Sequence, residues 1–367
     1  MKHMMKRAMA GLGLVCATSL GGVSVQAAGF ANNDFSASGV GAANAVVAGI
    51  ADVSAASYNP AAIAWLEGVH VQGGFATRFR NSSVKSGAGV QPNTGKGKSV
   101  AAVHASWMPH DSNFGLSVAW SRPFLNNTIW GGDLTDIQSE RLSVDLIYAV
   151  SSTLSVASGL DVYKTKVRMT QGGASFSGTD TASFGGNIGV NWKPAPLWGV
   201  GLLLRSGTKA KVKSGIQSLE LRLPEQVTLG VSYDMNDSIR LEADVAYERW
   251  SRLKNLNVQG STITYAAGLS DTVAIKTAAT WYWLPDTMFR FGYAYEQGAN
   301  SKSNFQAAIA DQSSHTASLG AGGALMGMHI DLAYAYQFHS KKSVTAPIVG
   351  QYRDRKQSFV FSVSKAF

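Results

Sequence analysis

Cysteine is almost absent from this chain of 367 residues, which contains only Cys16. A single cysteine cannot form an intramolecular disulfide, so the sequence excludes a disulfide-stapled scaffold. After residue 27 the sequence also lacks any apolar run long enough to cross a membrane as a helix. A helical membrane protein is therefore excluded. A transmembrane β-barrel is not excluded, because its strands alternate apolar and polar residues and contain no long apolar run.

The N-terminal segment has the features of a secretory signal peptide. Three cations precede an apolar stretch from Ala8 to Leu20, and a small-x-small sequence ends at Ala27. The stretch is too short and too rich in glycine to favour an uncleaved anchor. We predict that residues 1–27 are removed and that Ala28 is the mature N-terminus.

Alternation of apolar and polar residues dominates the rest of the chain. One face of residues 239–248 carries apolar side chains, and the other carries Arg240, Glu242, Asp244 and Glu248. Four ionisable groups on one face of a strand suit a watery interior and not the core of a sandwich. The same alternation occurs at 142–150, 273–283, 289–295 and 329–338.

The breaks between these strands are alternately short and long. The short ones fall at 109–112, 151–152, 194–196, 235–236, 285–286 and 326–327, and the long ones at 81–97, 122–136, 168–180, 207–224, 250–270, 298–312 and 340–355. Short periplasmic turns and long outer loops are typical of outer-membrane barrels, which have an even number of strands. We predict an all-β fold, a transmembrane antiparallel β-barrel of about fourteen strands, in the outer membrane of a Gram-negative cell.

Both ends of the mature chain fit this architecture. Residues 28–67 do not alternate and have too few large apolar side chains to form a domain alone, so we predict a small plug, or hatch, inside a barrel of residues 68–367. Within it, the Asn-Pro step of "YNPAAIAW" predicts a turn leading into a short helix. The last strand ends at the aromatic Phe367, a signal of the kind that the barrel assembly machinery reads.

Several ordered segments resemble one family. The mature start at residues 28–30, the segment "DFSASGVGAANA" and the motif at 59–61 are similar to the hatch of the FadL-type long-chain fatty-acid transporters of Gram-negative outer membranes. Later segments resemble the same family's barrel, among them "LRLPEQVTLG", "AYERWSRLKNL", "FGGNIGVNWKP" and "LLLRSGTKAKV". The resemblance runs from about Ala28 to Phe367.

The resemblance implies a monomeric, fourteen-stranded barrel that imports hydrophobic molecules passively and needs no cofactor. It implies a ligand pocket lined by the mature N-terminus, a hatch that rearranges, and a kinked third strand that opens the wall toward the bilayer. The implied positions are Ala28, Gly29 and Phe30 in the pocket, Asn59, Pro60 and Ala61 in the hatch motif, and Gly115 as a weak point in a third strand at about 113–121, with Pro123 just beyond it.

The substrate class stays open between long-chain fatty acids, which we favour, and neutral aromatic hydrocarbons. Both need an apolar path, but a fatty acid also needs a cation for its carboxylate. Lys276 is the first candidate for that cation, followed by Arg240 and Arg290, which face inward by parity. For Arg240 we expect ion pairing with Glu242 and Asp244 as the competing role.

Other functions are less well supported by the sequence. A general porin would have no plug, and neighbouring Ser314 and His315 fall on opposite faces of a strand, which argues against a lipase dyad. No spacing of His or Cys predicts a metal site. The compartment disfavours nucleic acid. Cations that flank the long loops predict a basic outer rim for lipopolysaccharide phosphates, namely Lys209, Lys211, Lys213, Arg249, Arg252, Lys254, Arg353, Arg355 and Lys356.

Overall fold

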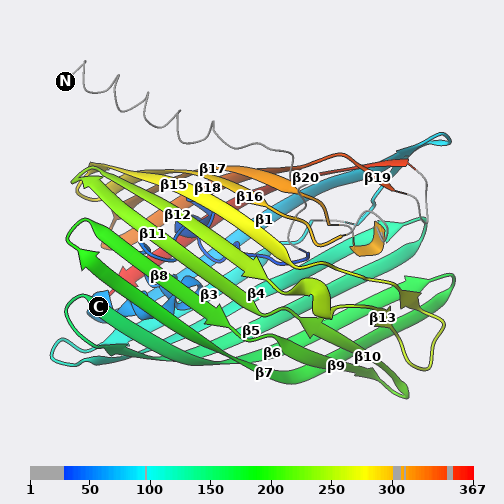
Figure 1. Cartoon of the computed structure of the whole chain (residues 1–367), viewed down its shortest axis with the longest axis horizontal. Coiled ribbons are helices and arrows are strands. Elements are labelled where there is room, and N and C mark those ends of the chain that lie inside the picture. Colours follow the sequence, from blue (N-terminus) through cyan, green and yellow to red (C-terminus); the bar gives the residue numbers. More distant parts are fainter. Residues whose placement is uncertain (1–28, 96, 301–306, 310, 345–349) are drawn as a thin grey trace.

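The structure, a computed structural model, describes residues 29–95, 97–300, 307–309, 311–344 and 350–367. The predicted signal peptide and Ala28 lie outside the described residues. Most strands form one antiparallel ring, which closes where the first strand pairs with the last (Figure 1), and two short strands, at 256–257 and 264–265, pair with each other outside it. The ring has 14 strands, so the predicted fold and strand number are confirmed.

Several strands of the ring are interrupted and carry two labels. The strands are β1 (Gly68–Ser86), β2 (Gly89–Pro92), β3 (Val100–Met108), β4 (Phe114–Trp130), β5 (Asp133–Ala149), β6 (Leu154–Gln171), β7 (Ala174–Ala195), β8 (Trp198–Arg205), β9 (Thr208–Ser214), β10 (Gln217–Leu223), β11 (Gln226–Asn236), β12 (Ile239–Glu248), β13 (Leu256–Asn257), β14 (Thr264–Tyr265), β15 (Thr272–Leu284), β16 (Thr287–Glu296), β17 (Ser314–Leu325), β18 (Met328–His339), β19 (Lys342–Val344) and β20 (Gly350–Ala366). The helical elements are α2 (Ala37–Gly41), α3 (Ala55–Tyr58) and the short 3₁₀ turns η1 (Pro60–Trp65), η2 (Trp250–Arg252) and η3 (Ala307–Ile309).

The ring is apolar outside and polar inside over its central band. On β5, Leu146 is 52% exposed on the outer face, whereas the neighbouring Asp145 is fully buried on the inner face. Exposed tryptophans mark the end with the short turns, namely Trp107, Trp192, Trp198, Trp281 and Trp283. Aromatic side chains at this level are typical of the interface between lipid and water.

The short turns lie within about two residues of the predicted positions, but three of the long loops, and much of a fourth at 81–97, were wrongly predicted. The chain at 122–136, 168–180 and 207–224 continues as strands that end in tight hairpins. The polarity of the strands inverts there. On β9, Lys209, Lys211 and Lys213 face out, and Ala210 and Val212 face in. We predicted loops because the outward face loses its apolar residues, but this loss only means that the strands have left the lipid.

This inversion gives the outer end of the barrel an apolar interior. The strand extensions and the loop after β12 pack into one cluster, whose largest buried side chains are Phe124, Ile137, Met169, Leu219, Leu221, Trp250, Leu253 and Leu256. Phe30 of the hatch belongs to the same cluster. A hydrophobic molecule entering from this end therefore meets an apolar core and not a water-filled pore.

Residues 29–67 fold into short helical turns inside the ring (Figure 1). Ser36 caps α2 by accepting a hydrogen bond from the Gly39 N–H at 3.0 Å, and Pro60 begins η1, where its missing N–H costs nothing. None of the helices in the described part of the chain is both long and apolar enough to cross a bilayer.

Candidate functional site

Phe30 packs at the boundary between the hatch and the outer apolar core. Its ring packs at 4.7 Å from Trp250 and 6.1 Å from Phe124, between their centroids, and the side chain is 7% exposed. The preceding Gly29 has a φ of +62°, and a Cβ on it would lie 2.5 Å from the Trp250 ring. Only glycine therefore lets the chain pass so close to Trp250.

A buried carboxylate holds the same segment from the other side. Asp311 accepts hydrogen bonds at 2.5 Å from the N–H groups of Gly29 and Ala299. Burial raises the pKa of the Asp311 carboxyl well above its usual range, although these hydrogen bonds act in the opposite direction. The start of the hatch is thus fixed to the loop between β16 and β17.

The third strand of the ring, β4, carries a bulge next to this segment. Its pairing with β5 shifts between Ser121 and Phe124, so that Arg122 and Pro123 together oppose Glu140. The two carbonyls of the bulge both accept hydrogen bonds from Asn32, at 2.8 Å from its side chain and 2.7 Å from its backbone. The bulge is therefore where the hatch is attached to the wall.

Gly115, the predicted weak point of that strand, lies elsewhere on it. Gly115 pairs with Ile147 in regular register, and the strand extends to Trp130, well past the predicted end. The irregularity falls at Arg122 and Pro123, so we move the proposed weak point there. Proline supplies the physical reason, because it cannot donate a ladder hydrogen bond.

The Asn59-Pro60-Ala61 motif ties the hatch to two other strands of the wall, β6 and β7. The Asn59 side chain is fully buried and donates to the Val47 carbonyl at 2.8 Å and to the Val190 carbonyl of β7 at 3.0 Å. Ser155 of β6 donates to the Ala61 carbonyl at 2.7 Å. One short motif thus joins two parts of the hatch to two strands.

Lys276 lies inside the barrel, 6% exposed, beside a cavity of about 50 Å³ between hatch and wall. Within the described residues it has no ion-pair partner within 4 Å. Two acids lie near it, Asp244, which is its direct cross-strand neighbour on β12, and Glu248, and the charge of Lys276 acts on both. Asp244 accepts from the N–H groups of Val46 and Val47, and Glu248 accepts from Gln226 and Trp250. Lys276 thus makes no direct ion pair within 4 Å among the described residues, and it lies next to a cavity.

Two arginines that we did not single out from the sequence line the same cavity. Arg141 and Arg205 are 1% and 4% exposed and share the carboxylate of Asp161, at 4.0 Å and 3.0 Å. The Arg141 guanidinium also lies 5.5 Å from the Phe35 ring of the hatch. Extending the alternation of 142–150 back by one residue would have placed Arg141 inward.

Arg240 and Arg290 face inward as predicted, but they lie at the end of the barrel with the short turns. They line a cavity of about 530 Å³ under hatch residues Ile50 to Asp52. Arg240 pairs with Asp234 directly across the strand pair at 2.6 Å, so the expected pairing with Glu242 and Asp244 was wrong. Cross-strand neighbours are closer than residues two apart on one strand. Arg290 pairs with Asp331 at 2.6 Å.

Comparisons with known proteins agree with this geometry. A family model described as outer membrane protein transport protein (OMPP1/FadL/TodX) matches residues 18–365. A crystal structure of a Pseudomonas aeruginosa FadL homologue superposes with a TM-score of 0.84 at 18% identity, covering 93% of this chain and 100% of that one. The Pseudomonas putida toluene transporter TodX gives 0.68 at 14% identity, with coverages of 87% and 95%. The CymD monoaromatic hydrocarbon channel gives 0.67 at 16% identity, with coverages of 91% and 97%. No curated protein matches the chain by sequence.

A closed barrel that is apolar outside, polar inside and filled by a hatch defines a class, the transport barrels of the outer membrane. The family match covers most of the chain, and the chain belongs to the outer membrane protein transport protein family that includes FadL and TodX. It is an outer-membrane transporter of hydrophobic compounds.

Proposed function

We propose that this protein imports long-chain fatty acids by passive diffusion. The observation that carries the proposal is Lys276, a buried lysine that has no direct ion pair among the described residues and lies beside an internal cavity. Glu248, which lines the cavity with Lys276, Arg141 and Arg205, accepts a hydrogen bond from Trp250 of the outer apolar core, so this core adjoins a cavity that contains cations. An acyl chain suits the first and a carboxylate suits the second.

Gating by the hatch follows from the size of this cavity. At about 50 Å³ it is far smaller than the roughly 300 to 1,000 Å³ of typical ligand pockets. A fatty acid therefore binds only when hatch residues move, and Phe30 is the side chain that separates the apolar core from the hatch. We propose that Gly29 and Phe30, with the mature N-terminal Ala28, form the movable side of the pocket, and that Asn59, Pro60 and Ala61 hold its fixed side.

Release through the wall is supported by the bulge of β4. Asn32 binds both bulge carbonyls, so movement of the N-terminal segment removes support from the wall at the same time. The substrate then passes sideways into the bilayer and not through the hatch.

The test is equilibrium binding of oleate and of toluene to the purified mature protein in detergent. Lys276→Ala is expected to weaken oleate binding by about 1.5 to 3 kcal/mol, the contribution of a charge-assisted hydrogen bond, and to leave toluene unaffected. Phe30→Ala is expected to change both ligands. If only toluene binds, and only Phe30 matters, the carboxylate assignment is wrong.

Uptake of aromatic hydrocarbons is the second candidate. The similar TodX structure is that of a toluene transporter and CymD that of a monoaromatic hydrocarbon channel, and an arene would use the same apolar core around Trp250. The buried cations at the cavity favour the fatty acid, because a neutral arene gains little from them.

We propose further that the protein acts as a monomer and not as an enzyme, and that Phe367 serves as the assembly signal. Ser314 points inward to Glu296 at 3.2 Å, whereas His315 bonds outward to Tyr293 at 2.7 Å. These two side chains form no catalytic pair, in keeping with a transport role.

A further inference from the structure

Lys356 is another interior lysine that makes no direct ion pair with a described residue. It lies on β20, in register with Arg80 of β1 and Gln337 of β18. In the described part of the chain it has no ion pair within 4 Å. The sequence had placed Lys356 on the outer rim, but its side chain borders two small cavities inside the wall.

The two cavities lie on either side of residues Gly29 to Ala31. The one toward the lumen has a volume of about 70 Å³, and its acids are already engaged: Asp34 with Arg78 at 3.2 Å, Glu296 with Gln337 at 3.0 Å, and Asp311 with Gly29. The one toward the wall has a volume of about 60 Å³. Because Lys356 and Arg78 line both cavities, an anion could move from one cavity to the other while it stays next to these two cations.

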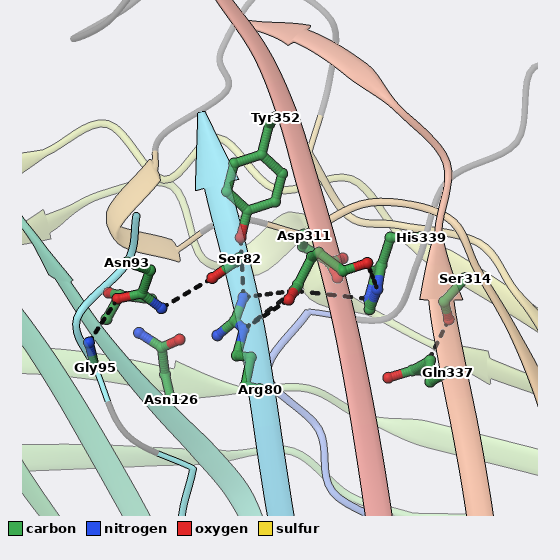
Figure 2. Close-up of polar contacts among 12 residues, drawn as sticks. Arg80, Ser82, Asn93, Gly95, Asn126, Asp311, Ser314, Gln337, His339 and Tyr352 are labelled. Carbon is green, nitrogen blue, oxygen red and sulfur yellow. Dashed lines mark hydrogen bonds and ion pairs between the residues drawn. The ribbon is translucent and has the colours of Figure 1, made fainter. Parts of the chain in front are cut away.

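The charged residues in the described lining of the wall cavity are all cations, although most of them are paired with aspartates outside the lining. Its described lining contains the cations Arg78, Arg80, Lys98 and Lys356 and no aspartate or glutamate. Arg80 is held by Asp354 at 2.8 Å and also donates to Tyr352 at 3.2 Å (Figure 2). Lys98 is paired with Asp136. Of the four cations, Lys356 alone has no ion pair within 4 Å among the described residues, although the charges of Asp354 and Asp311 act on it.

This cavity lies where the strand pairing of the wall is broken. Pairing between β1 and β3 ends at Ala76, and pairing between β3 and β4 ends at Trp120. Beyond these points the wall is completed by the hatch, because Phe30 and Asn32 bond the backbone of β4 at Leu125 and Pro123. A ligand leaving sideways would pass this break.

We propose that the wall cavity is a carboxylate site, separate from the one at Lys276, where Lys356 binds the head group of the departing amphiphile. The proposal rests on the proposed function, since it requires a substrate with a carboxylate. Arg78 completes the site. Its ion pair with Asp34 of the hatch is replaced by an ion pair with the carboxylate of the substrate. A bound anion thus displaces the hatch from the wall, and a neutral ligand does not.

Uptake into liposomes that contain the mature protein tests this site. Lys356→Met is expected to slow oleate uptake about tenfold, to keep equilibrium oleate binding within about twofold of wild type, and to leave toluene uptake unchanged. Lys356→Arg should restore oleate uptake, because it restores the charge. Lys213→Met, which removes an exposed lysine on β9, is the matched control.

Two results would overturn the proposal. In one, Lys356→Met takes up oleate as fast as Lys213→Met; in the other, it slows oleate and toluene equally, which indicates a structural role only. The two carboxylate sites are separable: an effect at Lys356 with none at Lys276 refutes the inner site alone, and the reverse refutes the wall site alone. If oleate is neither bound nor taken up by wild type, both proposals fail.

Discussion

At the scale of single residues, buried charges and their hydrogen bonds connect the hatch to the barrel wall. Lys276 could be placed inward from the sequence because alternation fixes the face of a strand residue. The hydrogen bonds that the neighbouring Asp244 accepts from the backbone of Val46 and Val47 could not be predicted, since the hatch supplies these donors. Asp311 is a similar case, because its partner Gly29 is distant in sequence.

Asp311 should make the attachment of the hatch sensitive to pH. Its folded-state pKa lies above the unfolded value, so its burial favours the protonated form, and stability falls as pH rises from the ordinary aspartate range through the raised pKa. We expect hydrogen exchange at Gly29 to be slowest in acid, after correction for intrinsic exchange. Asp311→Asn should abolish the pH dependence of this exchange. A variant with the pH profile of wild type would argue against a role for Asp311.

Asn59 should hold the hatch through both of its hydrogen bonds. Asn59→Ala removes donors to two buried carbonyls, each loss costing about 1 to 3 kcal/mol. We expect faster proteolysis and higher conductance across planar bilayers, with the barrel itself unaffected. A variant with the conductance and protease resistance of wild type would show that the motif does not fix the hatch.

At the scale of elements, the sequence predicts strands well inside the lipid and poorly outside it. The alternation at 142–150 and 239–248 identifies β5 and β12, because the lipid imposes an apolar outer face. Beyond the lipid this constraint disappears, and the strand extensions of β9 and β10 read as loops. The bulge of β4 could not be located from the sequence either. The predicted third strand ends before Pro123, whereas the observed strand continues through it.

The bulge offers a direct test of release through the wall. Deleting Pro123 leaves one residue opposite Glu140 and restores regular pairing. We expect oleate uptake to fall about tenfold or more while oleate binding persists, because entry is intact and the side exit is closed. Uptake at the wild-type rate would contradict lateral release.

At the scale of the whole molecule, one part of the outer surface carries a patch of lysines. Four lysines face outward on the extensions of β6 and β9, which flank β7, and Lys166 and Lys213 share one register row through Thr179 of β7. The four are Lys164, Lys166, Lys211 and Lys213. None of the four has an ion-pair partner among the residues that the structure describes. Since this patch lies just beyond exposed Leu160 and Phe184, it suits the phosphates of lipopolysaccharide.

Replacing these four lysines by glutamate should reduce the lipopolysaccharide that copurifies with the barrel. The expected loss is severalfold, and raising the salt concentration should weaken wild-type binding in the same direction. Phosphate analysis of the purified protein measures it. An unchanged lipopolysaccharide content would assign these lysines to solvation only.

The central claim is that the barrel recognises a carboxylate at the end of an acyl chain. The most direct measurement compares equilibrium binding of oleate and of oleyl alcohol to the mature protein, because these ligands share a tail and differ only in the head group. We predict that oleate binds at least about tenfold more tightly, and that Lys276→Met removes the difference. Equal binding of the two ligands to the wild-type protein would contradict the account.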